Sequence, residues 1–445
     1  MSYYDSSEND RYLNPMDITI ENGYTIEVFA EGLDAPSSIL FTEDGYLIIA
    51  NSGYTSGKPD VSILRNGTFE IIYDRFNIPL LGINYNNGLI YVSHKGIIST
   101  LTIDGIRKDI ITGLPSYGDY SNCRVDFSPD GKMYFGQGAA TNSGVVGTDN
   151  LWLPDYSFFC DRPGASVILN GQNFITNNIL NSSEKEIIST GAFSPFGVAI
   201  HSNEMRKGII KASGSILRAN RDGSEMELVA WGLRCPSYLK FNEDRLYVSN
   251  NGYDVRGSRP IANAPDEFIM ITQDTWYGFP DYAGGEPITL PRFKSEGGEQ
   301  PEFLFSCHPK LPPKPFAIFP PDSFIVGFVF NEDKSFGTPG EIYIAEFGSI
   351  QLNTIGGLRQ LFPMSGYKIS KINPYTGSIS TFAMNKSGFP SYITREGGLG
   401  RPVDMAFGPD GALYVADMGT STRENPNLII PNTGVIWRIK KERLA

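Results

Sequence analysis

Short apolar runs separated by tight turns recur at a fixed interval near the start of the chain. Each run alternates before the turn and becomes continuously apolar after it, as in residues 39–41 and 47–50. The turns, each 43 residues after the one before, are Asp44-Gly45, Asn87-Gly88 and Asp130-Gly131. Asn or Asp followed by Gly favours a hairpin, because both positions tolerate positive φ angles. A period of roughly 40 to 50 residues made of strands and turns is typical of β-propeller blades.

The same strand pattern returns three more times at wider intervals, around Asp244, Pro339 and Asp410. Six copies predict an all-β, six-bladed β-propeller, because each blade buries its core against its neighbours. The blades are expected to begin near Pro36, Leu80, Asn122, Pro236, Phe316 and Pro402. A seventh blade around residues 196–223 is an alternative. We favour residues 215–220 as the third strand of the third blade instead.

The first apolar segment, residues 18–29, reads as strands without a turn partner of their own. We expect it to close the ring by pairing with residues 434–440, because closure removes exposed sheet edges. The domain prediction is an N-terminal tail, residues 1–17, and one propeller, residues 18–445, with insertions at about 136–210, 252–315 and 348–398.

Loops on one face of a propeller gather over its central channel, so these insertions are expected to wall a ligand pocket. The alternative is that they are additions without a binding role or form an oligomer contact.

Composition narrows the choice of partner. The 445 residues carry a formal net charge of −12, which disfavours nucleic acid and anionic membranes and favours a small neutral or cationic ligand. No stretch approaches the ~20 apolar residues that span a bilayer. The N-terminus is polar and lacks the features of a signal peptide. The sequence as written therefore predicts a cytoplasmic protein, or a periplasmic or extracellular one if a leader was removed.

Polar and aromatic side chains gather after the fourth blade. Two Arg beside Asp and Asn hold carboxylates or sugar hydroxyls in fixed directions, and Trp and Tyr offer flat faces for a ring. The candidates are Asn250, Asn251, Asp254, Arg256, Arg259, Trp276 and Tyr277. The alternative is that the Arg and Asp side chains only fasten loops to one another.

Two further arginines, Arg234 and Arg401, precede the innermost strands of the fourth and last blades. Their equivalent places beside the channel favour an anionic or quinone-like ligand on the axis. A flat slot between Arg234 and Trp276 is then expected to hold a tricyclic ring. Pairing of each arginine with a neighbouring Asp is the alternative.

Four segments together resemble the glucose/sorbosone dehydrogenase family: WGLRCPSYLKF, YVSNNGYDVRGSRP, WYGFPDYAGG and RPVDMAFGPDGALYVADMG. The likeness runs from about Gly32 to the C-terminus. Members are six-bladed soluble quinoproteins that carry pyrroloquinoline quinone (PQQ) and calcium. The resemblance implies hydride transfer from a sugar or alcohol to the quinone, with an electron acceptor that the sequence does not name. In such chemistry the protein orients the reactants and supplies a base.

Two positions depart from the family pattern. Tyr120 stands where the family has its catalytic His, and Tyr is a poorer base because its pKa is near 10 rather than about 6.5. Cys235 stands where the family has an Asn beside the cofactor, and a thiol does not replace both groups of an amide. The resemblance thus assigns Tyr120 and Arg234 to catalysis. It assigns to cofactor binding Arg234, Cys235, Asn250, Asn251, Asp254, Arg256, Arg259, Trp276, Tyr277 and Arg401.

Three functions stay open. The first is a PQQ-dependent sugar or alcohol dehydrogenase, and the second is a non-catalytic propeller of the same family that binds a sugar, alcohol or quinone. The third is a calcium-dependent, lactonase-like hydrolase. Oxygen ligands for its axial calcium would come from Asn51, Asp126, Asn250, Glu346 and Asp417.

The four cysteines form no CxxC pair, and each alone reads as a small buried hydrophobe. Cys123 and Cys235, however, both precede innermost strands of adjacent blades. They are candidates for a thiol pair or a soft-metal site across the channel mouth. The three histidines are scattered, and His94, at the end of a strand in the second blade, either reaches the channel or lies on the surface.

Overall fold

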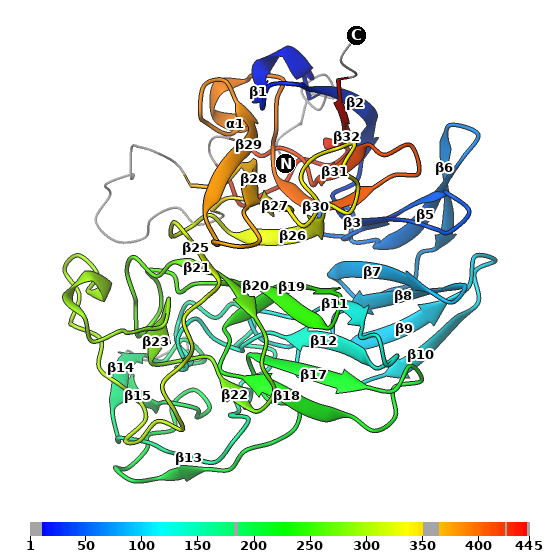
Figure 1. Ribbon diagram of the computed structural model, residues 1–445. Coiled ribbons are helices and arrows are strands. Elements are labelled where there is room, and N and C mark those ends of the chain that lie inside the picture. The colour runs from blue at the N-terminus through cyan, green and yellow to red at the C-terminus, as the bar shows by residue number, and fades with distance from the viewer. Residues whose placement is uncertain (1–10, 182–185, 350–364, 423–424, 443–445) are drawn as a thin grey trace.

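The computed structural model is a ring of six β-sheets around a common axis (Figure 1). It describes residues 11–181, 186–349, 365–422 and 425–442. Neighbouring strands within each blade pair antiparallel, with one two-residue exception, and this confirms the all-β, six-bladed prediction. None of the helices among these residues is long or apolar enough to cross a membrane.

Blades one and two are four-stranded meanders with the predicted turns. Blade one contains β3 (Pro36–Phe41), β4 (Leu47–Asn51), β5 (Asp60–Arg65) and β6 (Thr68–Tyr73). Blade two contains β7 (Leu80–Asn86), β8 (Leu89–His94), β9 (Ile97–Leu101) and β10 (Arg107–Ile111). Asn87 and Gly88 have φ angles of 51° and 78°, as a tight hairpin turn requires. Ile48, Val61 and Ile90 pack between the two blades.

Blades three and four carry the two long insertions. Blade three contains β11 (Asn122–Phe127), β12 (Met133–Gln137), β17 (Ser215–Ala219) and β18 (Glu227–Trp231), with β22 (Thr275–Trp276) parallel to β18. Blade four contains β19 (Cys235–Asn242), β20 (Arg245–Asn251), β21 (Asp266–Met270) and β25 (Ala317–Phe319). Because β17 pairs with β12, residues 215–219 belong to the third blade, as predicted.

The first insertion contains β13 (Val167–Ile168), β14 (Asn173–Asn177), β15 (Ile187–Gly191) and β16 (Met205–Arg206). The second contains β23 (Tyr282–Ala283), β24 (Glu286–Pro287) and η2 (Pro291–Phe293). The two insertions lie at the lower left of Figure 1. They pack against each other, because Phe193 of the first contacts Phe279 and Phe305 of the second. The expected second insertion, 252–315, also includes the blade strand β21.

Blades five and six complete the ring. Blade five contains β26 (Ile325–Phe330), β27 (Ile342–Glu346), β28 (Lys368–Ile372), β29 (Ile379–Asn385) and β1 (Ile18–Ile20). Blade six contains β30 (Pro402–Phe407), β31 (Leu413–Asp417), β32 (Gly434–Lys441) and β2 (Tyr24–Leu33). The short helices η1 (Pro15–Asp17) and α1 (Ser391–Thr394) lie beside them.

Two predicted boundaries in this half are wrong. The fifth blade begins at Ile325 and not near Phe316, because β25 pairs with β21 and so completes the fourth blade. The expected insertion 348–398 includes β28 and β29, which are the third and fourth strands of the fifth blade. Residues 350–364 of that segment lie outside the described residues.

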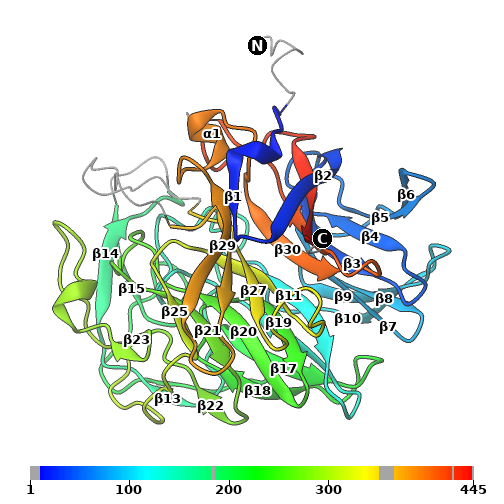
Figure 2. The same ribbon diagram turned by 45° about the horizontal axis from the view of Figure 1, so that its top comes forward.

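The N-terminal segment closes the ring as predicted, although only part of it pairs with the last strand. Strand β2 is antiparallel to β32, with Val28 opposite Trp437. Strand β1 instead pairs with β29, with Ile18 opposite Asn385 (Figure 2). The segment therefore fastens blade five as well as blade six, which the sequence pattern did not predict.

A buried polar hub joins the innermost strands at the centre. One carboxylate oxygen of Asp404 accepts hydrogen bonds from the Ser38 hydroxyl at 2.6 Å and the Ile39 amide at 3.0 Å. The same oxygen lies 3.4 Å from the Arg124 guanidinium, which also donates to the Tyr238 hydroxyl at 2.5 Å. The hub thus connects blades one, three, four and six.

Candidate functional site

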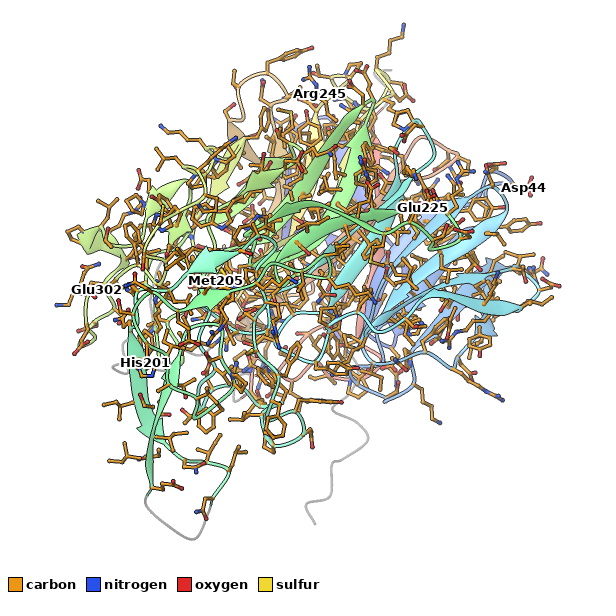
Figure 3. All side chains as sticks on the ribbon, turned by 90° about the horizontal axis from the view of Figure 1, so that it is seen from below. Asp44, His201, Met205, Glu225, Arg245 and Glu302 are labelled. Atoms are coloured by element: carbon orange, nitrogen blue, oxygen red, sulfur yellow. The ribbon has the colours of Figure 1, made fainter. Side chains whose placement is uncertain are left out.

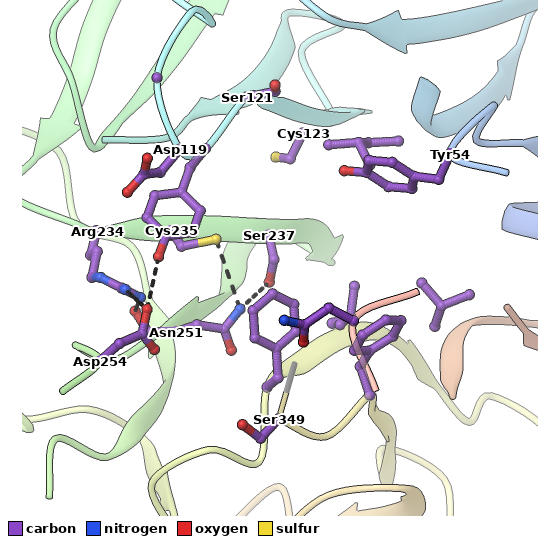
Figure 4. A pocket seen from close by; sticks show the side chains of 18 of the residues that line it. Tyr54, Asp119, Ser121, Cys123, Arg234, Cys235, Ser237, Asn251, Asp254 and Ser349 are labelled. Atoms are coloured by element: carbon purple, nitrogen blue, oxygen red, sulfur yellow. Dashed lines mark hydrogen bonds and ion pairs between the residues drawn. The ribbon is translucent and has the colours of Figure 1, made fainter. Parts of the chain in front are cut away.

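A cavity of about 660 Å³ lies on the axis, and all six blades contribute to its wall (Figure 4). Ser37, Cys123 and Val403 line it, and each directly precedes a residue of the polar hub. The hub therefore forms the floor of the cavity. Loops that follow the second strands of the blades, together with the insertions, build its walls.

Arg234 dominates the wall that blade four builds. Its guanidinium is almost fully buried and donates to Asp254 Oδ2 at 2.5 Å and to Asn142 Oδ1 at 2.8 Å. It also donates to the carbonyls of Asn142 and Gly252. All three guanidinium nitrogens are thus engaged inside the protein, and the cation lies 4.6 Å from the centre of the Tyr120 ring.

Arg256 forms the second cationic centre of this wall. Its three nitrogens donate to Asp254 at 3.1 Å, to Asp149 at 2.5 Å and to Asp119 at 2.6 Å. Burial alone would raise the pKa of Asp254, but the two guanidiniums outweigh it and lower that pKa. The wall is therefore a closed network of two cations and three carboxylates.

Tyr120 and two thiols face the same space. The Tyr120 hydroxyl donates to Asp254 at 3.3 Å and accepts from Arg256 at 3.1 Å, and burial raises its pKa. Cys123 and Cys235 both line the cavity as free, buried thiols, and burial raises the pKa of each to about 12. All three groups hold their protons at neutral pH.

The carboxyl groups of the cavity wall outnumber its basic side chains. Five aspartates line it: Asp119, Asp149, Asp254, Asp266 and Asp322. The basic side chains of the described lining residues are Lys95, Arg234 and Arg256. Burial raises the pKa of Asp266 to about 8, so at neutral pH four carboxylates face three cations. The part of the cavity wall that the structure describes therefore presents no excess positive charge.

The wall from blades five and six is mainly apolar. Its apolar residues are Phe324, Val326, Phe347, Val403, Met418, Leu428 and Ile429, and Ser349 and Asn427 are polar positions among them. Arg401, predicted to face the axis, lies behind this wall with 1% of its surface exposed, and its guanidinium is 4.8 Å from the centre of the Phe347 ring. It donates to the Pro426 carbonyl at 2.6 Å. The expectation that Arg401 meets an axial ligand is wrong, because the Phe347 side chain stands between them.

Asn250 and Arg259 also lie outside the cavity wall, and both fasten backbone. The Asn250 amide oxygen accepts from the backbone N–H groups of Arg234 and Cys235 at 3.0 and 3.1 Å, so it positions the wall from behind. Arg259 is paired with Asp281 at 3.1 Å and donates to the Ser143 carbonyl, which joins the two insertions.

Trp276 and Tyr277 are core residues. Trp276 is 3% exposed and stacks on His308 with ring centres 5.2 Å apart. The Tyr277 hydroxyl donates to the Met270 carbonyl at 3.1 Å. The expected slot between Arg234 and Trp276 is therefore wrong, because the insertions pack around the indole ring.

The structure separates the histidines and the proposed calcium ligands. His94 is fully buried in blade two, His308 pairs with Asp281 at 3.0 Å, and His201 lies at the periphery on the first insertion (Figure 3). The proposed calcium ligands Asn51, Asp126, Asn250, Glu346 and Asp417 are on five different blades, and none lines the cavity. Among the described residues, no three His, Cys, Asp or Glu side chains form a metal-binding group.

Comparisons with known proteins agree with this architecture. No protein-family model matches the sequence, and no curated protein does. The holo PQQ domain of pyranose dehydrogenase from Coprinopsis cinerea matches 97% of this chain over 98% of its own, with TM-score 0.59 and 15% identity. A calcium structure of the Trichoderma reesei family AA12 enzyme matches 98% of this chain over 99% of its own, with TM-score 0.55 and 14% identity.

The PQQ-bound aldose sugar dehydrogenase from Streptomyces coelicolor matches 95% of this chain over 100% of its own, with TM-score 0.50 and 14% identity. The fold is that of soluble PQQ-dependent sugar dehydrogenases. The family resemblance that the sequence motifs indicate is thus confirmed at the level of fold.

Several cavity residues were missed in the sequence, although the blade repeat marks one of them. Asn51 and Asn250 hold equivalent register positions, opposite Pro36 and Pro236 and directly before the same register shift. The loop after Asn51 should therefore face the axis like the loop after Asn250, and its Tyr54 does line the cavity. Asp119, Asp149, Trp152, Phe324 and Phe347 carry no comparable local signal.

Proposed function

We propose that the axial cavity binds a small neutral polyhydroxylated molecule, a sugar or sugar-like alcohol, and that it does so without PQQ. The observation that carries this proposal is the saturation of both cavity arginines. Every guanidinium nitrogen of Arg234 and Arg256 already has a partner within the protein.

PQQ does not fit the residues present. It carries three carboxylates, which require unpaired cations when they leave water. Lys95 is the one basic side chain among the described lining residues that lies outside the arginine network. Placing three more carboxylates beside Asp119, Asp149 and Asp322 adds like-charge repulsion, which costs several kcal/mol in a partly desolvated site.

The protonation states favour binding over hydride chemistry. A dehydrogenase needs a base, and at the position of the family's catalytic His the raised pKa of Tyr120 leaves its hydroxyl protonated and donating to Asp254. Calcium binding in the cavity is also disfavoured, because the carboxylates of the polar wall are paired with the two arginines. Of the three functions considered, this supports the ligand-binding propeller.

A sugar matches the remaining chemistry of the cavity. Carboxylate oxygens that are already ion-paired still have lone pairs, so Asp119 and Asp149 can accept hydrogen bonds from hydroxyls. Asp322, whose pKa burial raises to about 6, also lines the cavity and adds a further acceptor. Aromatic faces such as that of Trp152, which lines the cavity beside Asp119, pack against the C–H groups of a sugar ring.

Calorimetric titration tests the proposal directly. The protein is titrated with glucose, galactose, mannose and xylose, and separately with PQQ in the presence and absence of calcium. We expect saturable binding of at least one aldose in the calorimeter. For PQQ, whose absorbance is recorded in parallel, we expect no shift in the absorbance spectrum. In Asp322→Asn the aldose affinity should fall about fivefold, since an acceptor to a hydroxyl is weakened.

Asp322 has a φ angle of 63°, which Asn also tolerates, so the variant is expected to fold. Binding of PQQ followed by aldose-dependent reduction of an artificial acceptor would establish the dehydrogenase instead. Failure of all four aldoses to bind would overturn the proposal.

A further inference from the structure

The axial cavity has two chemically different sides. On the side of blades three and four, Arg234, Arg256 and their three aspartates form a charged wall. On the side of blades five and six, the wall is mainly apolar, with phenylalanine, valine, methionine, leucine and isoleucine side chains and two neutral polar residues, Ser349 and Asn427. A free monosaccharide has hydroxyls around its whole ring, so it satisfies one side and leaves the other in contact with water.

The apolar side continues outward to the mouth of the cavity. Leu428 and Ile429 extend it beyond Met418, and Leu151 and Tyr117 border the mouth from the other side. Leu151 is 92% exposed and Leu428 is 53% exposed. Exposed apolar residues grouped around a concave site mark a place where an apolar group binds.

An aromatic cluster holds the far side of the mouth in place. The rings of Tyr117 and Tyr156 are 4.6 Å apart, and Phe159 contacts both Tyr117 and Trp152 edge to face. Tyr117 and Trp152 line the cavity themselves. This side of the mouth is thus preorganised, which lowers the entropic cost of binding.

We propose that the ligand is an amphiphile, namely a glycoside that carries an alkyl or aryl group. This inference rests on the sugar-binding function proposed above and specifies its ligand. The sugar ring contacts the wall of Arg256, Asp119 and Asp149. The alkyl or aryl group lies along Phe324, Phe347 and Met418 and leaves the cavity past Leu428.

The depth of the apolar surface favours a small molecule over a protein partner. Apolar lining continues from Leu428 at the mouth to Val326 and Val403, which adjoin hub residues at the floor. A flat protein surface would cover the mouth and leave this interior wall in contact with water. A slender alkyl chain reaches it.

A homologous series of ligands tests the inference. Methyl, butyl and hexyl β-D-glucosides and β-D-galactosides are titrated calorimetrically, at concentrations below micelle formation. We expect the affinity for one sugar series to rise about fourfold for each methylene that becomes buried. Hexanol, which lacks the sugar, should bind at least tenfold more weakly than the hexyl glycoside.

Variants at the mouth provide a matched comparison. The double variant Leu151→Ser with Leu428→Ser should lower the hexyl-to-methyl affinity ratio at least fivefold. Phe158→Ser is the control, because Phe158 is 86% exposed on the same insertion as Leu151 but does not line the cavity. The hexyl-to-methyl affinity ratio of Phe158→Ser should equal that of the unaltered protein. All three positions are exposed, so the fold should be retained.

The outcomes separate this inference from the function on which it rests. Equal affinity for methyl and hexyl glycosides overturns the amphiphile and leaves sugar binding intact. The amphiphile inference is also overturned if the double variant has the same hexyl-to-methyl affinity ratio as the unaltered protein. If neither glycosides nor free aldoses bind, the proposed function itself fails.

Discussion

At the residue scale, polar side chains at the end of the second strand of each blade hydrogen-bond neighbouring segments together. They lie at equivalent register positions, opposite a residue at the start of the innermost strand, and they are Asn51, His94, Gln137, Asn250, Glu346 and Asp417. The Asn51 amide, for example, donates to both carboxylate oxygens of Asp60. Buried polar groups are stable only when hydrogen-bonded, so these positions are structural first.

His94 makes stability depend on pH through this role. Its Nδ1 accepts from the Asn77 amide at 3.1 Å, and its Nε2 lies 2.9 Å from the Ser99 hydroxyl. Burial lowers its pKa from 6.5 to about 4. Between those pH values the unfolded chain takes up a proton that the folded protein does not. The contribution of His94 to stability is thus complete above pH 6.5 and is lost as the pH falls towards 4.

The variant His94→Asn isolates this effect, because Asn keeps an acceptor but does not titrate. As the pH falls from 6.5 to 4, we expect the free energy of unfolding to fall more steeply for the unaltered protein than for the variant. The two slopes should differ by up to about 1.4 kcal/mol per pH unit. Urea unfolding at pH 4.5, 5.5, 6.5 and 7.5 measures the difference. Parallel pH profiles would contradict the assignment.

The sequence singled out Arg234, Asp254 and Arg256 of the charged wall, but neither Asp119 and Asp149 of that wall nor the apolar wall. Arg234, Asp254 and Arg256 stand close to the ends of the innermost strand pair of one blade, so the repeat itself places them near the axis. Trp276 and Tyr277 carry the same kind of signal, yet both face the core. Packing between two insertions that are far apart in the sequence decides the direction in which each ring points. The local sequence pattern does not predict that packing.

At the element scale, the blades followed from short-range rules. A turn dipeptide and two alternating runs define a hairpin locally, and this is why blades one, two and three begin where the pattern places them. The predicted boundary between blades four and five is wrong, because β25 and β26 are both short apolar strands in one stretch of sequence. Only their long-range partners, β21 and β27, show that they belong to different blades.

The pairing of β2 with β32 offers a test of ring closure. Thr25 and Lys440 are register partners near the two ends of the chain. A disulfide in the double variant Thr25→Cys, Lys440→Cys would constrain nearly the whole unfolded chain. The chain-entropy model gives stabilisation on the order of 5 kcal/mol for so long a loop.

We expect the thermal midpoint of the oxidised double variant to rise by several degrees and to return on reduction. Cys307 is exposed and free in the unaltered protein, so Cys307→Ser should be included in both the variant and its control to prevent mispairing. A midpoint that does not respond to reductant would show that β2 is already open when the rest of the ring unfolds.

At the scale of the whole molecule, the ring depends on close contact between innermost strands. Asp404, Arg124 and Tyr238 connect strands of three blades at the floor of the cavity. Gly82 of blade two allows the approach of Arg124, because a Cβ atom there would lie 2.5 Å from the Arg124 Cβ. The absence of a side chain at one position thus brings blades two and three together beneath the site.

Gly82→Ala should therefore be far more costly than an ordinary glycine substitution. The added methyl group meets the Arg124 backbone at 2.7 Å, so the two strands must separate and the hub is disturbed. We expect a loss of about 3 kcal/mol in the free energy of unfolding. Gly67→Ala is the comparison. Gly67 has a φ of 79° with no atom within 4 Å of the added Cβ, so only backbone strain, about 1 kcal/mol, should destabilise that variant.

If unfolding experiments give equal losses of stability for both variants, the ring does not depend on the contact between Gly82 and Arg124. A larger loss at Gly82, accompanied by weaker ligand binding, would show that the hub supports the fold and the cavity together.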